Sequence, residues 1–140
     1  MQRPAGRTFG LMLALVLTAG CGKAQPKLSQ LSGKVTFKGQ PVPAGYINFQ
    51  AEAGPVKMVR IVNGTYDTAT AKEPGIYPGK VVIRIAGFDG KKLDYFPDGK
   101  QIFNPYELHD TISEGTSTKD FEVPASAANN LKIERTADIP

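Results

Sequence analysis

Alternation of apolar and polar residues limits most of this chain to β-structure. Val35 and Phe37 share one face of a first run, and Ile47 and Phe49 share one face of a second. Successive side chains of a strand point to opposite faces, and no stretch keeps a helical apolar period for three turns. The 15 Gly and 11 Pro favour frequent turns. We therefore expect one all-β domain, a β-sandwich of seven short strands at residues 31–38, 46–50, 56–62, 65–70, 80–86, 116–123 and 131–134.

Two turns are expected from local chemistry. Asn63-Gly64 stands between two strand-like runs, and a type I′ hairpin turn needs positive φ at both of its central positions. The segment Lys38-Gly39-Gln40-Pro41 combines a glycine with a proline that fixes its own φ. The first pair predicts a hairpin and the second predicts a turn after the first strand.

The N-terminus has the pattern of an export signal. Arg3 and Arg7 precede an apolar run over residues 9–19, which is shorter than the ~20 residues that a membrane-spanning helix needs. The only cysteine, Cys21, follows Leu17-Thr18-Ala19-Gly20, and this arrangement resembles the lipobox of bacterial lipoproteins. In that family the cysteine is acylated and becomes the mature N-terminus. The alternative is an ordinary secretory signal with Cys21 as a free thiol.

The resulting organisation has four parts. Residues 1–20 are expected to be a lipoprotein signal peptide, 21–30 a polar tether with the lipidated Cys21, 31–134 the β-sandwich domain and 135–140 a polar tail. Without residues 1–20 the chain holds 15 basic and 13 acidic residues. No cluster of Lys and Arg interleaves with aromatic residues, so we expect no nucleic-acid partner. Gly22 after the cysteine favours the outer membrane over the inner one, by the sorting pattern of that family.

The chain also resembles a domain family. Residues 32–43, Ser-Gly-Lys-Val-Thr-Phe-Lys-Gly-Gln-Pro-Val-Pro, are similar to the opening of carboxypeptidase regulatory-like (transthyretin-like) domains. The segments 63–66, 74–81, 104–106 and 116–134 look like those of small lipoproteins of the planctomycete type. The resemblance implies a prealbumin-like Greek-key sandwich in the cell envelope, held by a lipid anchor. It implies no known activity.

No residue set predicts catalysis or a bound metal. His109 lies beside Asp110 and near Glu107, but a metal site needs three or four ligands and no second His is present. Asp94, Asp98 and Gly99 lack the spacing of a calcium loop. Transthyretin-like hydrolases of purine breakdown use several histidines, so their site does not carry over to this chain. We expect no enzyme activity, no cofactor and no metal.

Residues 87–115 are the segment most relevant to function, and we expect them to form one long loop. Binding residues tend to lie on ordered loops of a rigid scaffold. Either the rings of this segment stack on a glycan or grip a peptide, or they fold back to cover one end of the sandwich. The rings belong to Phe88, Tyr95, Phe96, Phe103 and Tyr106.

Together these features predict a non-catalytic structural or interaction module of the cell envelope. Its expected partners are a membrane, reached through an acyl anchor at Cys21, and an envelope protein or glycan. The alternative function is a glycan- or peptide-binding protein that uses the aromatic loop 87–115.

Overall fold

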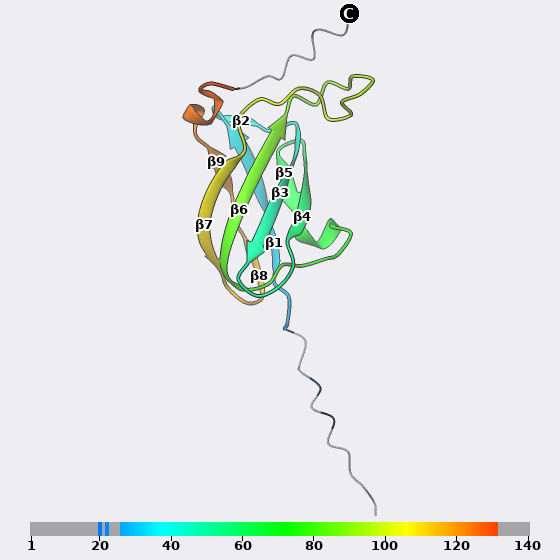
Figure 1. Cartoon of the computed structure of the whole chain (residues 1–140), viewed down its shortest axis with the longest axis vertical. Helices are drawn as coiled ribbons and strands as arrows, with labels where there is room; N and C mark the ends of the chain where they lie inside the picture. Colours follow the sequence, from blue (N-terminus) through cyan, green and yellow to red (C-terminus); the bar gives the residue numbers. More distant parts are fainter. Residues whose placement is uncertain (1–19, 21, 23–25, 132–140) are drawn as a thin grey trace, which may run out of the picture.

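The computed structural model describes residues 20, 22 and 26–131 of the chain (Figure 1). These residues form nine strands, two short 3-10 helices and no α-helix. The 3-10 helices are η1 (Thr68–Thr70) and η2 (Ala125–Ala128). The strands are β1 (Gln30–Phe37), β2 (Gln40–Pro41), β3 (Ala44–Ala51), β4 (Lys57–Val62), β5 (Thr65–Asp67), β6 (Gly79–Phe88), β7 (Tyr106–Ile112), β8 (Thr116–Thr118) and β9 (Phe121–Val123).

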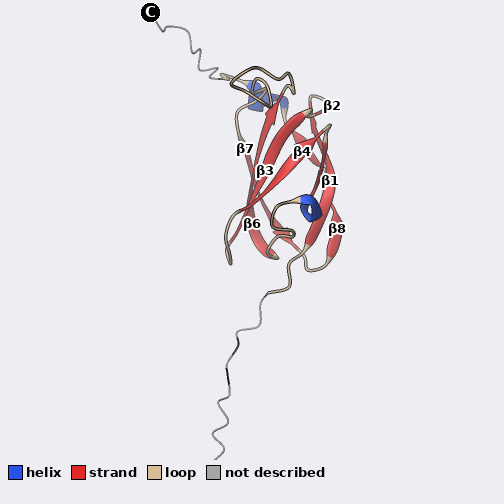
Figure 2. Ribbon diagram, turned by 90° about the vertical axis from the view of Figure 1, so that its right-hand side faces the viewer, coloured by secondary structure: helices blue, strands red, loops and turns tan. Residues whose placement is uncertain are grey.

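The strands make one curled sheet in the order β2-β1-β5-β4-β3-β6-β7. Neighbours along this path are antiparallel, whereas β8 and β9 pair with β1 in parallel. Ser32 pairs with Asp67 of β5 and also with Thr118 of β8, so these two strands occupy opposite edges of β1. The strands run along the long axis of the domain, with the start of β1 at one end and the loop after β6 at the other (Figures 1 and 2).

The core lies inside the curl and is built by alternate residues of the long strands. The strands β3 and β4 bury every second side chain and turn the others outward, and β6 does so up to Ile85, after which Ala86 and Gly87 are also buried. This is the two-residue period that the sequence predicted, and it confirms an all-β domain. The fully buried side chains include Val35, Ile47, Phe49, Val59, Ile61, Ile83, Ile85 and Phe103.

Both expected turns are present. Asn63 and Gly64 have φ of 49° and 75°, and they join β4 to β5. Lys38 and Gly39 have φ of 50° and 73°, and they join β1 to β2. Positive φ at both central positions is the type I′ pattern, so both sites are tight hairpins.

The prediction of one long loop over residues 87–115 is wrong. β6 extends to Phe88, and Tyr106–Ile112 form β7, which pairs with β6 from Gly79 to Ile85. The exposed residues of β7 are Glu107, His109 and Thr111, and the inward ones are only partly buried before Ile112. An edge strand of this composition lacks the apolar alternation by which the central strands were predicted.

The strand count also differs from the predicted seven, because β2 and β7 were not expected and the expected strand 116–123 is divided. The expected strand 116–123 is divided into β8 and β9, since the Asp120 carboxylate accepts the hydrogen bond of the Lys34 N–H at 2.8 Å. The expected strand 65–70 ends at Asp67, whose side chain caps η1 by accepting from the Ala69 N–H. The expected strand 131–134 lies outside the described residues beyond Leu131, as do the tail 135–140, Cys21 and residues 1–19.

Tyr66 ties β5 to the segment between β8 and β9. Its ring is buried against Phe121, with ring centroids 5.6 Å apart, and its hydroxyl donates to the Lys119 carbonyl at 2.7 Å. Burial raises the pKa of Tyr66 above the ordinary tyrosine value of about 10, and the nearby Asp120 carboxylate raises it further. The phenol therefore stays protonated and keeps its hydrogen bond well into the alkaline range.

This shift predicts an alkaline loss of stability that depends on Tyr66. A pKa that is higher in the folded than in the unfolded chain stabilises the fold fully below about pH 10, and the stabilisation is lost as pH rises through the folded value. We expect Tyr66→Phe to lower the free energy of unfolding by about 1 kcal/mol at pH 7, through the lost hydrogen bond. Urea unfolding followed by circular dichroism measures this, and above about pH 10 the variant should lose less stability than the wild type. Equal alkaline losses in the two proteins would contradict the prediction.

Candidate functional site

The five aromatic residues proposed for ligand binding do not converge on one surface. Phe103 is fully buried and packs on Phe37, with ring centroids 4.9 Å apart. Phe88 faces outward from β6 and lies 6.0 Å from the Tyr46 ring, and Tyr106 packs against the core from β7. Only Tyr95 and Phe96 project into solvent, with 91% and 54% of their surface exposed. The set therefore divides between the core, the sheet face and a loop.

Tyr95 and Phe96 belong to a closed loop at residues 89–100, which we call the finger. The Asp89 carboxylate accepts hydrogen bonds from the N–H groups of Lys91 and Lys100, each at 3.0 Å. The first of these bonds is the main cause that lowers the pKa of Asp89. Further along, Leu93 and Phe96 exchange two backbone hydrogen bonds, of 3.0 and 2.9 Å. The finger is thus held in shape by its own hydrogen bonds.

An ion pair fastens the finger to the sheet. The Arg60 guanidinium on β4 donates to both oxygens of Asp98, with N–O distances of 3.2 and 2.6 Å. Arg60 is 57% exposed, and such surface pairs contribute about 1 kcal/mol or less. The bidentate geometry still fixes a direction, so the finger leans toward β4.

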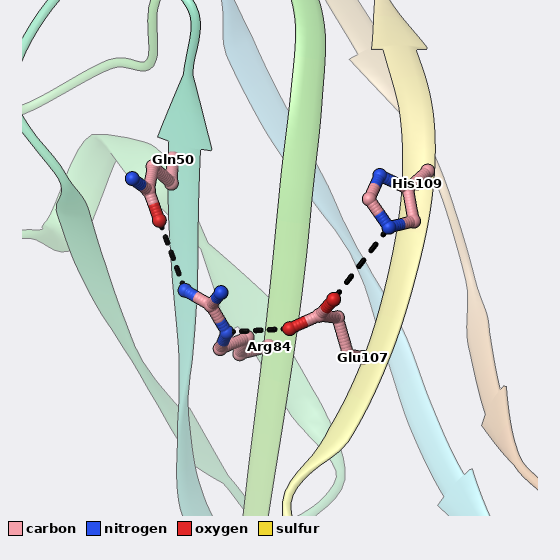
Figure 3. Close-up of polar contacts among 4 residues, drawn as sticks. All are labelled: Gln50, Arg84, Glu107 and His109. Carbon is pink, nitrogen blue, oxygen red and sulfur yellow. Dashed lines mark hydrogen bonds and ion pairs between the residues drawn. The ribbon is translucent and has the colours of Figure 1, made fainter.

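A row of polar side chains crosses the outer face of the sheet over β3, β6 and β7 (Figure 3). Arg84 Nε donates to Glu107 Oε2 at 2.7 Å, and another guanidinium nitrogen donates to Gln50 Oε1 at 2.9 Å. His109 Nε2 lies 3.5 Å from Glu107 Oε1. The row borders a shallow, open depression of about 560 Å³, which Lys80, Val82 and Thr111 also line.

This row offers hydrogen bonding and little else. Its side chains are well exposed, at 47% for Arg84, 45% for Glu107 and 74% for His109. Asp110 points to the opposite face from His109 and pairs with Lys119, a hydrogen bond that lowers the pKa of Asp110. In the described part of the chain no three His, Cys, Asp or Glu residues gather as metal ligands. The row can therefore hydrogen-bond to a polar partner.

The sequence pattern grouped Glu107 with His109 but gave no indication of Arg84 and Gln50. Glu107 and His109 are two residues apart on one strand, which a strand pattern brings to the same face. Arg84 reaches Glu107 because the two residues pair across β6 and β7. That register is set by the whole sheet, and no local signal in the sequence announces it.

Comparison with known proteins adds little to this picture. No protein-family model matches the chain, and no curated protein matches it significantly. Among solved structures it is similar to a DUF3823 family protein from Parabacteroides merdae, with 17% identity and a TM-score of 0.44. The match covers 71% of this chain and 47% of that one, so this chain spans about half the length of that protein.

The placement of the rings predicts that one substitution has a large effect on stability and another has almost none. Phe103→Ala should lower the free energy of unfolding by about 3–5 kcal/mol, because it leaves a cavity in the core. Tyr95→Ala should change the free energy of unfolding by about 0.5 kcal/mol or less, because its ring is in solvent. Urea unfolding of the two variants beside the wild type measures this. Similarly small losses in both would contradict the placement of Phe103 in the core.

Proposed function

We propose that the chain is an exported lipoprotein whose β-domain is a non-catalytic interaction module of the cell envelope. Arg3, Arg7, the apolar run 9–19 and the solitary Cys21 support export and acylation. Acylation would also account for a single cysteine in an exported chain. Two or three acyl chains hold a protein on a membrane stably, where one does not. Gly22 after the cysteine favours the outer membrane.

The proposal also concerns the family to which the β-domain belongs. We assign the domain to the carboxypeptidase regulatory-like, prealbumin-type Greek-key sandwiches, the planctomycete-type lipoproteins among them. Support comes from the opening motif, whose Gly33 and Val35 lie on β1 and whose Gly39 lies in the turn to β2. A Cβ at Gly33 would collide with the Lys119 carbonyl. This close approach explains why the motif has a glycine at this position.

The observation that carries an interaction role is the exposed tip of the finger. Leu93, Tyr95 and Phe96 are 46%, 91% and 54% exposed on a loop whose own hydrogen bonds keep them there. Apolar side chains grouped in this way on a soluble surface mark a contact site. The tip lies at the far end of the domain from the start of β1, so a tether at the N-terminus would present it away from the anchor (Figure 1).

A second candidate is glycan or peptide binding on the outer face of the sheet. The polar row of Gln50, Arg84 and Glu107 supports it, because planar amide and guanidinium groups hydrogen-bond sugars and backbones. Tyr46 and Phe88 add two half-buried rings to the same face. In this version Tyr95 and Phe96 contribute from the finger.

In the part of the chain that the structure describes, no helix has the length and apolar content to cross a membrane.

The lipoprotein half of the proposal predicts the fate of Cys21. Full-length protein expressed in bacteria should lose residues 1–20, gain acyl mass at Cys21 and fractionate with membranes. Cys21→Ser should gain no acyl mass and should not be processed at this position. Intact mass spectrometry and membrane fractionation of the two proteins measure this. If both proteins are soluble and neither carries acyl mass, the anchor is wrong.

A further inference from the structure

We propose that the tip of the finger docks on an anionic lipid surface, as a membrane contact separate from the acyl anchor. Leu93, Tyr95 and Phe96 would enter the interface between water and hydrocarbon, and the lysines beside them would contact the lipid headgroups. The proposal goes beyond the envelope role above and does not depend on acylation, because every group it uses belongs to the described domain.

The apolar part of the tip is arranged for shallow insertion. Leu93 and Phe96 flank a two-residue turn formed by Asp94 and Tyr95, so one carboxylate shares the apex with the tyrosine ring. The N–H and C=O groups of Leu93 and Phe96 are satisfied by each other. Polar backbone without a partner is costly to bring near hydrocarbon, so this pairing removes a barrier to insertion. Tyrosine itself is enriched at the membrane–water interface, where its ring is buried and its hydroxyl stays wet.

The charges of the finger favour an anionic surface. Of its three carboxylates only Asp98 is paired with a cation, Arg60, whereas Asp89 stays ionised and accepts hydrogen bonds from backbone N–H groups. Among the described residues, Lys91, Lys92 and Lys100 make no ion pair, and Asp89 and Asp94 are the carboxylates of the finger without a paired cation. Three lysines against these two carboxylates leave a small positive balance around the apolar tip. Lysines close to anionic lipids each add attraction that falls off within a Debye length.

A lysine in a neighbouring turn adds to the positive charge near the tip. Lys38 lies in the β1–β2 hairpin, with its Nζ 5.2 Å from the centre of the Phe37 ring. Phe37 packs on Phe103, which contacts Gly87 at the base of the finger, so this hairpin belongs to the same end of the domain. Lys38 likewise makes no ion pair with the residues that the structure describes.

The shape of the tip favours a lipid surface over a protein partner. Protein partners are generally anchored by side chains that fill pockets, and a protruding tip offers no pocket for a partner's side chain. The depression on the sheet face is lined by β3, β6 and β7 and by no residue of the finger. Because the tip and the start of β1 lie at opposite ends, a domain attached at both to one bilayer would lie along it (Figures 1 and 2).

The experiment uses the absence of tryptophan from the chain. Tyr95→Trp in the full-length Cys21→Ser protein places one fluorophore at the tip without an acyl anchor. The matched control is Met58→Trp in the same background, since Met58 is 58% exposed on the outer face of β4. Circular dichroism checks that both variants keep the wild-type fold. Each is titrated with vesicles of phosphatidylcholine alone and with vesicles that also contain phosphatidylglycerol.

We expect the indole emission of the Tyr95→Trp variant to shift to the blue, and to be quenched by brominated lipid, on the phosphatidylglycerol vesicles. The Met58→Trp emission should remain that of a solvent-exposed indole. Lys91→Gln, Lys92→Gln and Lys100→Gln combined should weaken the titration roughly tenfold to a hundredfold and reduce its dependence on salt. Because the readout is local, binding of vesicles through residues 1–20 does not produce it.

Three results would overturn the proposal. If the indole at position 95 keeps the emission of a water-exposed group on every vesicle, the tip does not enter lipid, and a protein partner is the alternative. Equal shifts at positions 95 and 58 would show a contact that is not the tip. Equal binding to both vesicle types would remove the role of the lysines. The anchor at Cys21 is judged separately, by mass, so the acylation of Cys21 and the docking of the tip fail independently.

Discussion

The pairing of β1 on both of its edges holds the fold together. One edge pairs with β5 and then β2, and the other pairs in parallel with β8 and then β9. Strands distant in the sequence therefore meet on one central strand, and the sheet must curl around the core. Close approach at Gly33 permits this, because a side chain there would collide with the Lys119 carbonyl. Tyr66 reinforces the same junction from β5 with its hydrogen bond to that carbonyl.

The curled sheet gives the finger a rigid base at one end of the domain. Phe103 fills the core beneath that end, while Arg60 holds Asp98 from the outer face of β4. The ion pair neutralises Asp98, and three lysines then outnumber Asp89 and Asp94 around the apolar tip. The polar row on β3, β6 and β7 is different in kind, since the charges of Arg84 and Glu107 are already paired with each other on an open sheet face.

Much of the fold could be predicted because its causes are local. Alternating β-branched residues identified β3, β4 and β6, and the turn chemistry of Asn63-Gly64 identified the hairpin. β7 was missed, because a half-buried edge strand with Glu107, His109 and Asp110 has no apolar signature of its own. The division of the loop aromatics could not be predicted either. Whether Phe103 or Tyr95 is buried depends on where the ends of distant strands lie. The pairing register of the whole sheet determines those positions.

The most direct test of the docking account is a nuclear magnetic resonance measurement on the Cys21→Ser protein with phosphatidylglycerol vesicles that carry a spin-labelled lipid. The account predicts that signals of Leu93, Tyr95 and Phe96 broaden strongly, while those of Glu107, His109 and Thr111 on the outer face of β7 change little. Broadening centred on β7 and the polar row, with the finger unaffected, would contradict it.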